Sequence, residues 1–404
     1  MRVLLLGAGG QGGPCASILA HDPDVEDILL GDINLETAER VQTKINSAKV
    51  SVARIDASVP ERVAEAAHGK DVVIDLVTPL YYYRVLQGAL EAGVHYVNTA
   101  FDRFMWDGKM ELGKKPKLQD AFQAKGISAL LGCGMSSGYT NVLARLYADR
   151  LDTVKSVKVR LAKKDTSLGK YGDAVTAWNP GWDPRQALLD FVLPATIFRD
   201  GKYEVKEKPF SEIEEWKFPE PIGRMPVSMH AHEEPYSIPL RFSDRGLTYC
   251  DFKYYVNMQI APLISLGLAS QEPIDVKGQQ VKPLDMVLAL TPKPSEGFLN
   301  ENPADFDHQD ETKLTYIMLE VAGKKDGAEK VYTIFIPTMN NPRRKMYALY
   351  GTALINVALP AVTGAKMLAK GGQPTGIIYP HDLDPEDFLK TMSNSGYEHK
   401  FVEV

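Results

Sequence analysis

The densest group of proton-exchanging side chains in this chain is the segment from His230 to Glu234, which reads His-Ala-His-Glu-Glu. A histidine exchanges protons near neutral pH, and a neighbouring carboxylate can hold a cationic substrate group. We therefore expect His232 to relay a proton, and Glu233 or Glu234 to bind a substrate ammonium. Because one short cluster without a second ligand set is a weak basis for zinc, no metal is predicted. The alternative is a partly exposed loop ahead of Pro235.

Further polar and aromatic side chains fall where the mouth of a cleft is expected. Asp102 follows an expected strand at residues 95–98 and could act as an acid or bind an ammonium group. An arginine can pair with a substrate carboxylate through two hydrogen bonds. The alternatives are packing on a second domain for aromatic residues and a solvated surface position for arginines. Besides Glu233, the residues expected to contact substrate are Tyr81, Tyr82, Trp178, Arg185 and Arg241.

The elements that must position these groups begin with a glycine-rich turn. Arg2 to Leu6 is a continuous apolar run typical of a strand buried on both faces, and Pro14 to Ala20 is typical of a helix. Between them, the GxGxxG pattern of Gly7 to Gly12 lets backbone N–H groups meet a pyrophosphate. The next strand ends at Asp32, whose carboxylate can bind a ribose 2′-OH and repels a 2′-phosphate. This predicts a Rossmann unit that favours NAD over NADP; the alternative for Asp32 is a helix cap.

Strands and helices continue to alternate after this unit, which predicts a doubly wound parallel α/β sheet. The expected strands are residues 51–55, 71–76, 95–98 and 128–131, with helices such as 60–67 and 81–92. Ligands in such sheets bind beyond the carboxyl ends of the strands, where loop residues are the alternative interpretation. Asp56 is expected near adenine, and Cys133 beside the cofactor rather than as a nucleophile. The residues expected to contact the cofactor are Gly7, Gly9, Gly10, Gln11, Gly12, Asp32, Ile33, Asp56, Ala57, Val77, Thr78, Pro79, Thr99, Ala100, Cys133 and Gly134.

Three stretches of the chain resemble the saccharopine dehydrogenase-like family: Gly7 to Gly12, Gly132 to Gly134 with Gly138, and Asp384 to Leu389. The family includes saccharopine reductase, lysine 6-dehydrogenase and carboxynorspermidine dehydrogenase. The resemblance is strongest to the last of these, because four further stretches occur there in the same order. These stretches are His232-Glu233-Glu234, Lys277-Gly278-Gln279, Pro283-Leu284 and Thr363-Gly364.

The resemblance implies an NAD(P)-dependent oxidoreductase that acts on a carbon–nitrogen bond of an amino acid or polyamine through an imine. It also implies a homodimer. NADP-dependent members of the family carry Ser-Arg where this chain has Gly31-Asp32, so NAD is the expected cofactor and NADP the alternative. The alternative functions are those of a homoserine- or dihydrodipicolinate-type oxidoreductase and of a redox sensor that binds a dinucleotide without turnover.

A second domain is expected from about residue 151, where the pattern changes to alternating strands. Strands are expected at residues 156–161, 247–256, 314–321 and 331–336, which indicates a mixed or antiparallel α+β sheet. Asp200-Gly201 and Asp326-Gly327 are typical of tight turns. A long helix from Arg343 to Ala369, interrupted at Pro360, and a last helix from Asp384 to about Ser395 should pack on the first domain. The predicted domains are thus residues 1–150 completed by about 343–404, and residues 151–342.

The composition of the chain narrows the class of protein. A length of 404 residues suits two domains, and a net charge of −6 with no basic block gives no reason to expect a nucleic-acid partner. Three widely spaced cysteines favour a reducing compartment. The apolar start is too short for a leader or membrane span. We therefore expect a cytoplasmic protein with a small-molecule amine or amino-acid substrate and no membrane partner.

Overall fold

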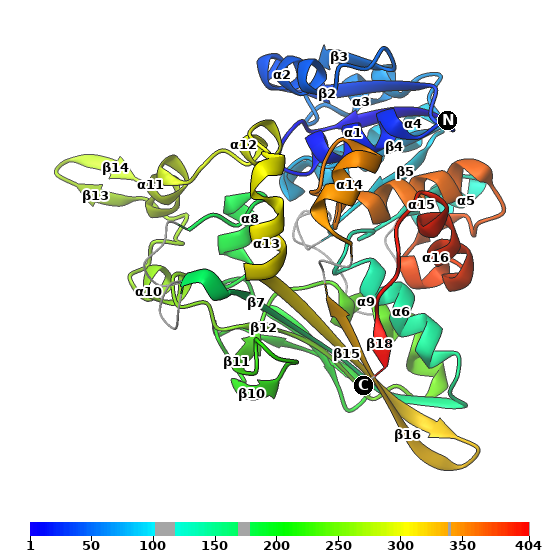
Figure 1. The fold of residues 1–404 in the computed structure, drawn as a ribbon, viewed down its shortest axis with the longest axis vertical. Coiled ribbons are helices and arrows are strands. Elements are labelled where there is room, and N and C mark those ends of the chain that lie inside the picture. Colours follow the sequence, from blue (N-terminus) through cyan, green and yellow to red (C-terminus); the bar gives the residue numbers. More distant parts are fainter. Residues whose placement is uncertain (102–117, 169–177, 338–340, 404) are drawn as a thin grey trace.

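The upper layer of the computed structural model in Figure 1 is a seven-stranded parallel sheet, whose N-terminal strands are blue and cyan. This layer is called the first half of the molecule. The structure describes residues 1–101, 118–168, 178–337 and 341–403. The strand order is β3 (Val50–Arg54), β2 (Asp27–Asp32), β1 (Arg2–Leu6), β4 (Val72–Asp75), β5 (His95–Asn98), β6 (Ser128–Leu130) and β17 (Gly376–Ile378). The first six follow the Rossmann order, which confirms the expected fold class.

Both faces of this sheet are covered, because neighbouring residues of each central strand pack into different cores. In β1, Val3 and Leu5 belong to one buried cluster, whereas Leu4 and Leu6 belong to another. This explains the continuous apolar run in the sequence. The first cluster is closed by α1 (Gly12–His21), α2 (Leu35–Ile45), α6 (Tyr139–Ala148) and the C-terminal helices, and the second by α3 (Pro60–Ala67), α4 (Tyr82–Ala92) and α5 (Gln119–Ala124).

The C-terminal part of the chain returns to the first sheet. Strand β17 pairs with β6, and α15 (Ala358–Lys370) contacts α1, β4 and β5. The same C-terminal part of the chain contains α14 (Arg343–Tyr350) and α16 (Pro385–Asn394). The interruption expected at Pro360 is wrong: the helix breaks at Gly351, where φ is +69°, and Pro360 lies in the first turn of α15. A proline is tolerated there because first-turn N–H groups have no partner within the helix.

The second half is a mixed sheet of nine strands, the lower layer in Figure 1. Strands β7 and β12 are parallel to each other and the other pairs are antiparallel. The turns expected at Asp200-Gly201 and Asp326-Gly327 join β8 to β9 and β15 to β16. The main path is β10 (Glu214–Lys217), β11 (Arg224–Met229), β12 (Tyr249–Tyr255), β7 (Thr153–Asp165), β15 (Lys313–Lys325), β16 (Ala328–Pro337) and β18 (Val402–Glu403), and β8 (Ala195–Arg199) and β9 (Lys202–Lys206) attach to β12.

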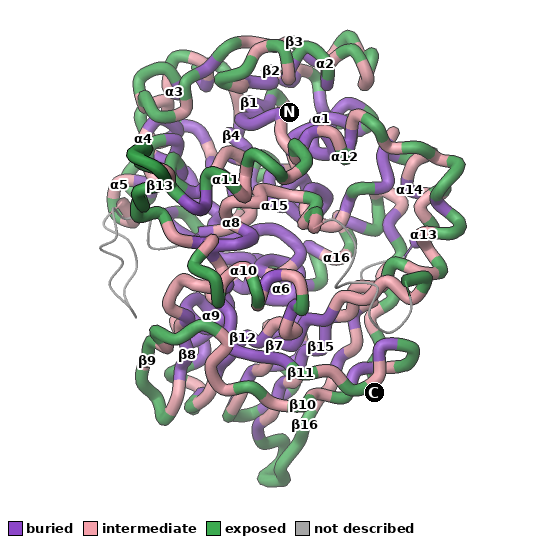
Figure 2. The backbone as a smooth tube through the Cα atoms, turned by 90° about the vertical axis from the view of Figure 1, so that its left-hand side faces the viewer, coloured by how far each residue is buried: buried purple, intermediate pink, exposed green. Residues whose placement is uncertain are grey.

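Helix α6 joins the two halves, since it contacts β7 and β15 of the second sheet as well as α16. The buried residues of α6 belong to one core that continues from the first sheet into the second, and Figure 2 shows this buried interior with an exposed rim. None of the helices in the described ranges is long and apolar enough to cross a bilayer. The remaining helices are α8 (Pro184–Leu189), α9 (Glu234–Phe242), α10 (Ile260–Ser265), α11 (Pro283–Leu290), α12 (Ser295–Leu299) and α13 (Phe306–Thr312), and a hairpin is formed by β13 (Ile274–Val276) and β14 (Gln279–Val281).

Candidate active site

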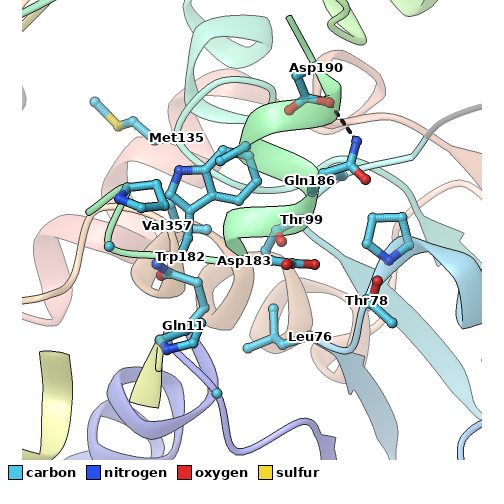
Figure 3. Close-up of a pocket in the computed structure, with 18 of the residues that line it drawn as sticks. Gln11, Leu76, Thr78, Thr99, Met135, Trp182, Asp183, Gln186, Asp190 and Val357 are labelled. Atoms are coloured by element: carbon cyan, nitrogen blue, oxygen red, sulfur yellow. Dashed lines mark hydrogen bonds between the residues drawn. The ribbon is translucent and has the colours of Figure 1, made fainter. Parts of the chain in front are cut away.

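A cavity of about 1080 Å³ lies between the carboxyl ends of the parallel strands and the second sheet. One wall consists of the glycine turn and the segments after β2, β3, β4 and β5. The opposite wall consists of β7, α8, β12 and the loop before α9. Figure 3 shows side chains from both walls, including Gln11 and Thr78 on one side and Trp182 and Asp190 on the other. A cavity at this edge of a parallel sheet, covered by a second sheet, is a common place for a ligand.

The glycine turn leaves backbone open to this cavity at the start of α1. Gly7 has φ +95°, and a Cβ on Gly12 would lie 1.7 Å from the Gly7 carbonyl oxygen, so both glycines are needed for the turn itself. A Cβ on Gly9 would meet nothing within 4 Å. No side chain caps α1 and its first turn carries no acid. The turn therefore fits the pyrophosphate of a dinucleotide, whose negative charge is favourable at an open helix N-terminus.

The carboxylate of Asp32 is fixed at the end of β2 beside this turn. It accepts hydrogen bonds from the backbone N–H of Ala8 at 2.7 Å and of Asn34 at 2.8 Å. Asp32 and Ile33 both line the cavity, and Ile33 is 55% exposed. Each carboxylate oxygen keeps a further lone pair for a ribose hydroxyl. The residues present thus fit an NAD(P) nucleoside, held by the backbone of the turn and by Asp32.

A cluster of three ionisable residues lies at the other end of the cavity, just before and at the start of α9. Glu234 is fully buried, and its carboxylate accepts hydrogen bonds from the hydroxyls of Ser136 at 2.6 Å and Thr140 at 2.8 Å. The Nδ1 atom of His232 hydrogen-bonds to Glu234 and lies 3.2 Å from Glu233. The His232 ring stacks on Phe252 of β12 with 3.8 Å between ring centroids. The segment from His230 to Glu233 is a loop in which His232 and Glu233 are partly exposed, as the alternative interpretation expected, but its ionisable side chains are held together at the cavity.

Glu233 connects this cluster to the Rossmann sheet. Its carboxylate accepts a hydrogen bond from the backbone N–H of Phe101 at 3.1 Å, just beyond β5. Thr99 and Ala100, in the same segment, line the cavity. The ionisable cluster of the second half is thus held against a strand end where the nicotinamide part of a dinucleotide is expected.

The three residues differ in their affinity for protons. Burial raises the pKa of Glu233 to about 7, although the positive charge of His232 opposes the rise. Burial also opposes the charge of His232, but the carboxylates of Glu234 and Glu233 outweigh it and raise its pKa to about 9. For Glu234, burial is outweighed by the His232 charge and three hydrogen bonds, which lower its pKa. Near neutral pH, a His232–Glu234 ion pair therefore lies beside a Glu233 that can gain or lose a proton.

The same three side chains could also hold a metal ion, because their ligand atoms lie within 4.8 Å of one another. However, the Glu234 carboxylate already accepts hydrogen bonds from Ser136, Thr140 and His232. A hydrogen-bonded acid–base cluster accounts for all of these contacts without an ion. The absence of a metal stays a prediction.

Most residues expected from the sequence lie along this single cavity. They include His232, Glu233, Tyr81, Tyr82, Trp178, Asp32, Ile33, Asp56, Ala57, Val77, Thr78, Pro79, Thr99, Ala100 and the turn residues Gly7, Gly9, Gly10 and Gln11. Their individual roles stay predictions. Asp102 lies outside the described residues.

Five expected site residues do not line the cavity. Arg185 hydrogen-bonds to Gln271, and Arg241 pairs with Asp382, so each guanidinium already has a partner on the protein. The structure therefore does not support the role expected for them, as anchors of a substrate carboxylate. Gly12 does not line the cavity, but its lack of a side chain allows the close approach to Gly7 that the glycine turn requires.

Cys133 and Gly134 also lie away from the cavity. The Cys133 thiol donates a hydrogen bond to the Pro360 carbonyl, and a Cβ added at Gly364 would lie 2.9 Å from its sulfur, so the side chain is packed under α15. Gly134 donates a backbone hydrogen bond to Ser137 within the turn before α6. Both residues hold this turn in place, whereas Met135 and Ser136 of the same turn line the cavity.

Several lining residues were missed by sequence reasoning. Ser136 lies between Gly134 and Gly138, and its proximity to Thr140 at a helix start is a signal that the sequence contains. Asp190, Lys163 and Tyr254 also line the cavity. No sequence motif marks them, because only the tertiary fold brings them there.

Two family models cover nearly the whole chain. Residues 3–130 match the saccharopine dehydrogenase NADP binding domain, and residues 134–397 match the saccharopine dehydrogenase C-terminal domain. The chain belongs to the saccharopine dehydrogenase family. The match of the second half as well as the first distinguishes it from a homoserine- or dihydrodipicolinate-type oxidoreductase.

Curated relatives in this family match end to end. The carboxyaminopropylagmatine dehydrogenase of Synechocystis is 26% identical, with 98% of this chain and 96% of the relative covered. The carboxynorspermidine synthase of Vibrio cholerae is 25% identical, with 100% of this chain and 97% of the relative covered. The strongest sequence resemblance, to the carboxynorspermidine-type enzymes of the family, is thereby confirmed.

Solved structures support the fold of the family. Saccharopine dehydrogenase (L-Glu forming) from Saccharomyces cerevisiae superposes with a TM-score of 0.67 at 14% identity and covers 100% of this chain and 99% of that one. Homospermidine synthase from Legionella pneumophila in complex with NAD superposes with a TM-score of 0.60 at 12% identity. The match covers 100% of this chain and 91% of that one. Together with the glycine turn, the family assignment makes this protein an NAD(P)-dependent dehydrogenase.

Proposed function

We propose that this protein catalyses reversible, NAD(P)-dependent formation of a secondary amine from an amine and a carbonyl compound through an imine. The observation that carries the proposal is the His232–Glu233–Glu234 cluster, bound to the strand end beyond β5 through Phe101. The curated relatives are named for carboxylated polyamines or agmatine derivatives, which favours a polyamine-related substrate.

The bound cofactor would supply or accept the hydride, and the protein would supply placement and protons. In the oxidative direction, ionised Glu233 takes a proton from the substrate ammonium before hydride leaves the adjacent carbon. Water then adds to the imine and releases the amine and the carbonyl compound. In the reductive direction, protonated Glu233 donates to the hydroxyl that leaves as the imine forms. The positive charge of His232 remains paired with Glu234 throughout.

The walls between these groups suit a cationic amine. Tyr81, Tyr82, Trp178 and Trp182 line the cavity, and aromatic faces attract ammonium groups. Asp190 also lines it, at the end of α8. A long amine can therefore lie along aromatic surface with one nitrogen near Glu233.

The direct test incubates pure protein and NADH or NADPH with pairs of amines and carbonyl compounds, followed by the mass of the product. The set includes lysine with 2-oxoglutarate and diamines with aspartate semialdehyde. A product two hydrogens heavier than the imine, formed with loss of NAD(P)H, supports the proposal. Cofactor binding without turnover of any pair would contradict it and favour a redox sensor.

NAD is the proposed physiological cofactor, with NADP as the alternative. The support is the position of Asp32, whose carboxylate faces the cavity beside the exposed Ile33 and would repel a 2′-phosphate.

A homodimer in the cytoplasm is the proposed state of the protein. A projecting arm made by α10, α11 and the β13–β14 hairpin, at the left of Figure 1, carries exposed apolar side chains. They include Leu266, Ile274, Met286 and Leu290, with exposed fractions from 50% to 85%. Exposed apolar side chains in such number are typical of a covered surface. A dimeric mass by light scattering that becomes monomeric in Leu290→Asp would support this arm as the contact.

A further inference from the structure

The cavity wall formed by the second sheet contains a lysine without a carboxylate partner. Lys163 lies on β7, where residues alternate between the two faces of the sheet, and Leu161 lines the cavity on the same face. Its partner across the ladder, Thr315 of β15, lines the cavity too. The side chain of Lys163 therefore faces the ligand space.

Two other basic residues of β7 are each paired with a carboxylate. Lys158 binds Glu320 at 2.7 Å, and Arg160 binds Asp251 at 2.7 Å. Within the described part of the chain, no carboxylate lies within 4 Å of the Lys163 ammonium group, and burial lowers its pKa. Arg343, the other lysine or arginine among the described lining residues, pairs with Asp310. A partly buried cation without a carboxylate partner is unfavourable unless a ligand supplies the negative charge.

A buried histidine next to this lysine also lacks a partner. His230 is only 6% exposed and lines the cavity, and its Nδ1 atom makes no hydrogen bond. Its ring stacks on Tyr254 with 4.8 Å between centroids, and the Lys163 ammonium lies 5.9 Å from the same Tyr254 ring. Burial and the nearby charges of His232 and Lys163 lower the pKa of His230, which keeps it neutral. A neutral imidazole can donate one hydrogen bond to an anion.

These groups contrast with the acidic groups of the same cavity. Glu233 and Glu234 are held by Phe101, Ser136 and Thr140, on the side of the Rossmann sheet. Asp190 accepts a hydrogen bond from the side chain of Gln186. One end of the cavity thus suits an ammonium group, and the wall at β7 and β12 suits an anion.

We infer that Lys163 and His230 bind a carboxylate of the substrate, with Lys163 as its counter-ion and His230 as a hydrogen-bond donor. The inference rests on the proposed function, because it assigns two residues of the same cavity to the binding of that substrate. It replaces the role first expected for Arg185 and Arg241. The two residues determine specificity and position the substrate; they exchange no proton with the reacting carbon and nitrogen.

The test compares Lys163→Met with Lys164→Met as the matched control. Lys164 neighbours Lys163 on β7, points to the other face and donates to the Pro221 carbonyl. Each variant is assayed with a productive carbonyl substrate and with its analogue lacking the carboxylate. We expect the kcat/KM of Lys163→Met to fall at least about tenfold on the carboxylated substrate and to stay unchanged on its analogue, because the variant loses one charge paired with the carboxylate. Lys163→Arg, which keeps the charge, should retain most of the discrimination.

The inference would be overturned if Lys163→Met lost kcat/KM equally on both substrates or lost none. It would also be overturned if Lys164→Met lost the same preference for the carboxylated substrate. A melting temperature measured for each variant separates misfolding from loss of binding. His230→Phe, which keeps the stacking on Tyr254 but lacks the ring nitrogens, should show a smaller loss of the same kind.

A binding measurement separates this inference from the proposed function. Saturation-transfer NMR with propanoate and its neutral match propan-1-ol needs no turnover and uses the full chain with NAD bound. Propanoate should bind the parent and Lys164→Met but not Lys163→Met, whereas propan-1-ol should not distinguish them. If no amine–carbonyl pair turns over but this pattern holds, the carboxylate site stands and the proposed reaction fails. Propanoate binding that is unchanged in Lys163→Met refutes the site whatever the reaction.

Discussion

The two ends of the cavity are built in different ways. At the glycine turn, the ligand surface is backbone: Gly9 is open, α1 has no capping side chain, and one carboxylate, Asp32, stands beside it. At the other end, the surface consists of side chains with shifted pKa values, held by hydrogen bonds from Phe101 beyond β5 and from Ser136 before α6. A backbone surface suits a group common to many enzymes, whereas buried ionisable side chains determine which reaction occurs.

The largest effect should come from removing the exchangeable proton. Glu233→Gln keeps the size of the side chain and an acceptor for the Phe101 N–H, but it cannot take or give a proton. We expect kcat to fall by about 10² to 10⁴, with the dissociation constant of NADH changed less than about twofold. Steady-state kinetics and NADH fluorescence titration measure the two quantities. A fall in kcat below tenfold would remove Glu233 from the reaction.

The pH dependence should follow from the same residue. The carboxyl of Glu233 is protonated below its pKa of about 7, so in the oxidative direction it cannot accept a proton there. The value of kcat/KM should therefore rise about tenfold per pH unit below 7 and level off above it. The reductive rate should show the opposite slope above 7. Because the pKa of His232 is raised to about 9, its ionisation should not shape the profile near 7. A flat profile from pH 6 to 8 in both directions would be inconsistent with this assignment.

A pair of glycine variants tests the backbone end. In Gly12→Ala, the added Cβ would lie 1.7 Å from the Gly7 carbonyl, so the turn must open and the melting temperature should fall. In Gly9→Ala, nothing lies within 4 Å of the added atom, so stability should hold while NADH binds at least about tenfold more weakly. Thermal denaturation and fluorescence titration distinguish the two. Unchanged NADH affinity in Gly9→Ala would mean that the phosphates lie elsewhere.

A smaller change is expected for cofactor choice. Replacing Asp32 by Ala together with Ile33→Arg removes a repulsive charge and adds a phosphate partner. The ratio of kcat/KM for NADPH over NADH should rise about tenfold or more, with Ile33→Arg alone as the control. Because Asp32 also binds the Ala8 N–H, affinity for both cofactors should weaken. An unchanged ratio would end the assignment of Asp32 to cofactor discrimination.

No effect at all is expected from metal removal. Although His232, Glu233 and Glu234 have ligand atoms close enough for an ion, their contacts form a closed hydrogen-bonded cluster. Activity after dialysis against EDTA should equal that of untreated protein, and elemental analysis should find less than one metal per chain. Loss of activity that zinc restores would assign the cluster to a metal instead.

The fold could be predicted far better than the site. The glycine turn, the parallel strands and Asp32 follow local rules in which a short segment defines both structure and ligand surface. Local rules also located His232 and Glu233, but they could not show that Ser136 and Thr140 bind Glu234 from another element. Nor could they distinguish Arg185, which has partners on the protein, from Lys163, which has no carboxylate partner among the residues that the structure describes. Partners of this kind are set by tertiary contacts between residues distant in sequence.

The return of α15 and β17 to the first sheet has a consequence for synthesis on the ribosome. The strands from β1 to β6 emerge early, but the helix that covers α1 and the strand that closes the edge of β6 are made near the end of the chain. Until then, apolar residues such as Cys15 and Leu19 lack their cover, and β6 offers an open edge. Until translation is nearly complete, the nascent nucleotide-binding half therefore exposes apolar surface and an unpaired strand edge, which are the features that favour pairing with other chains.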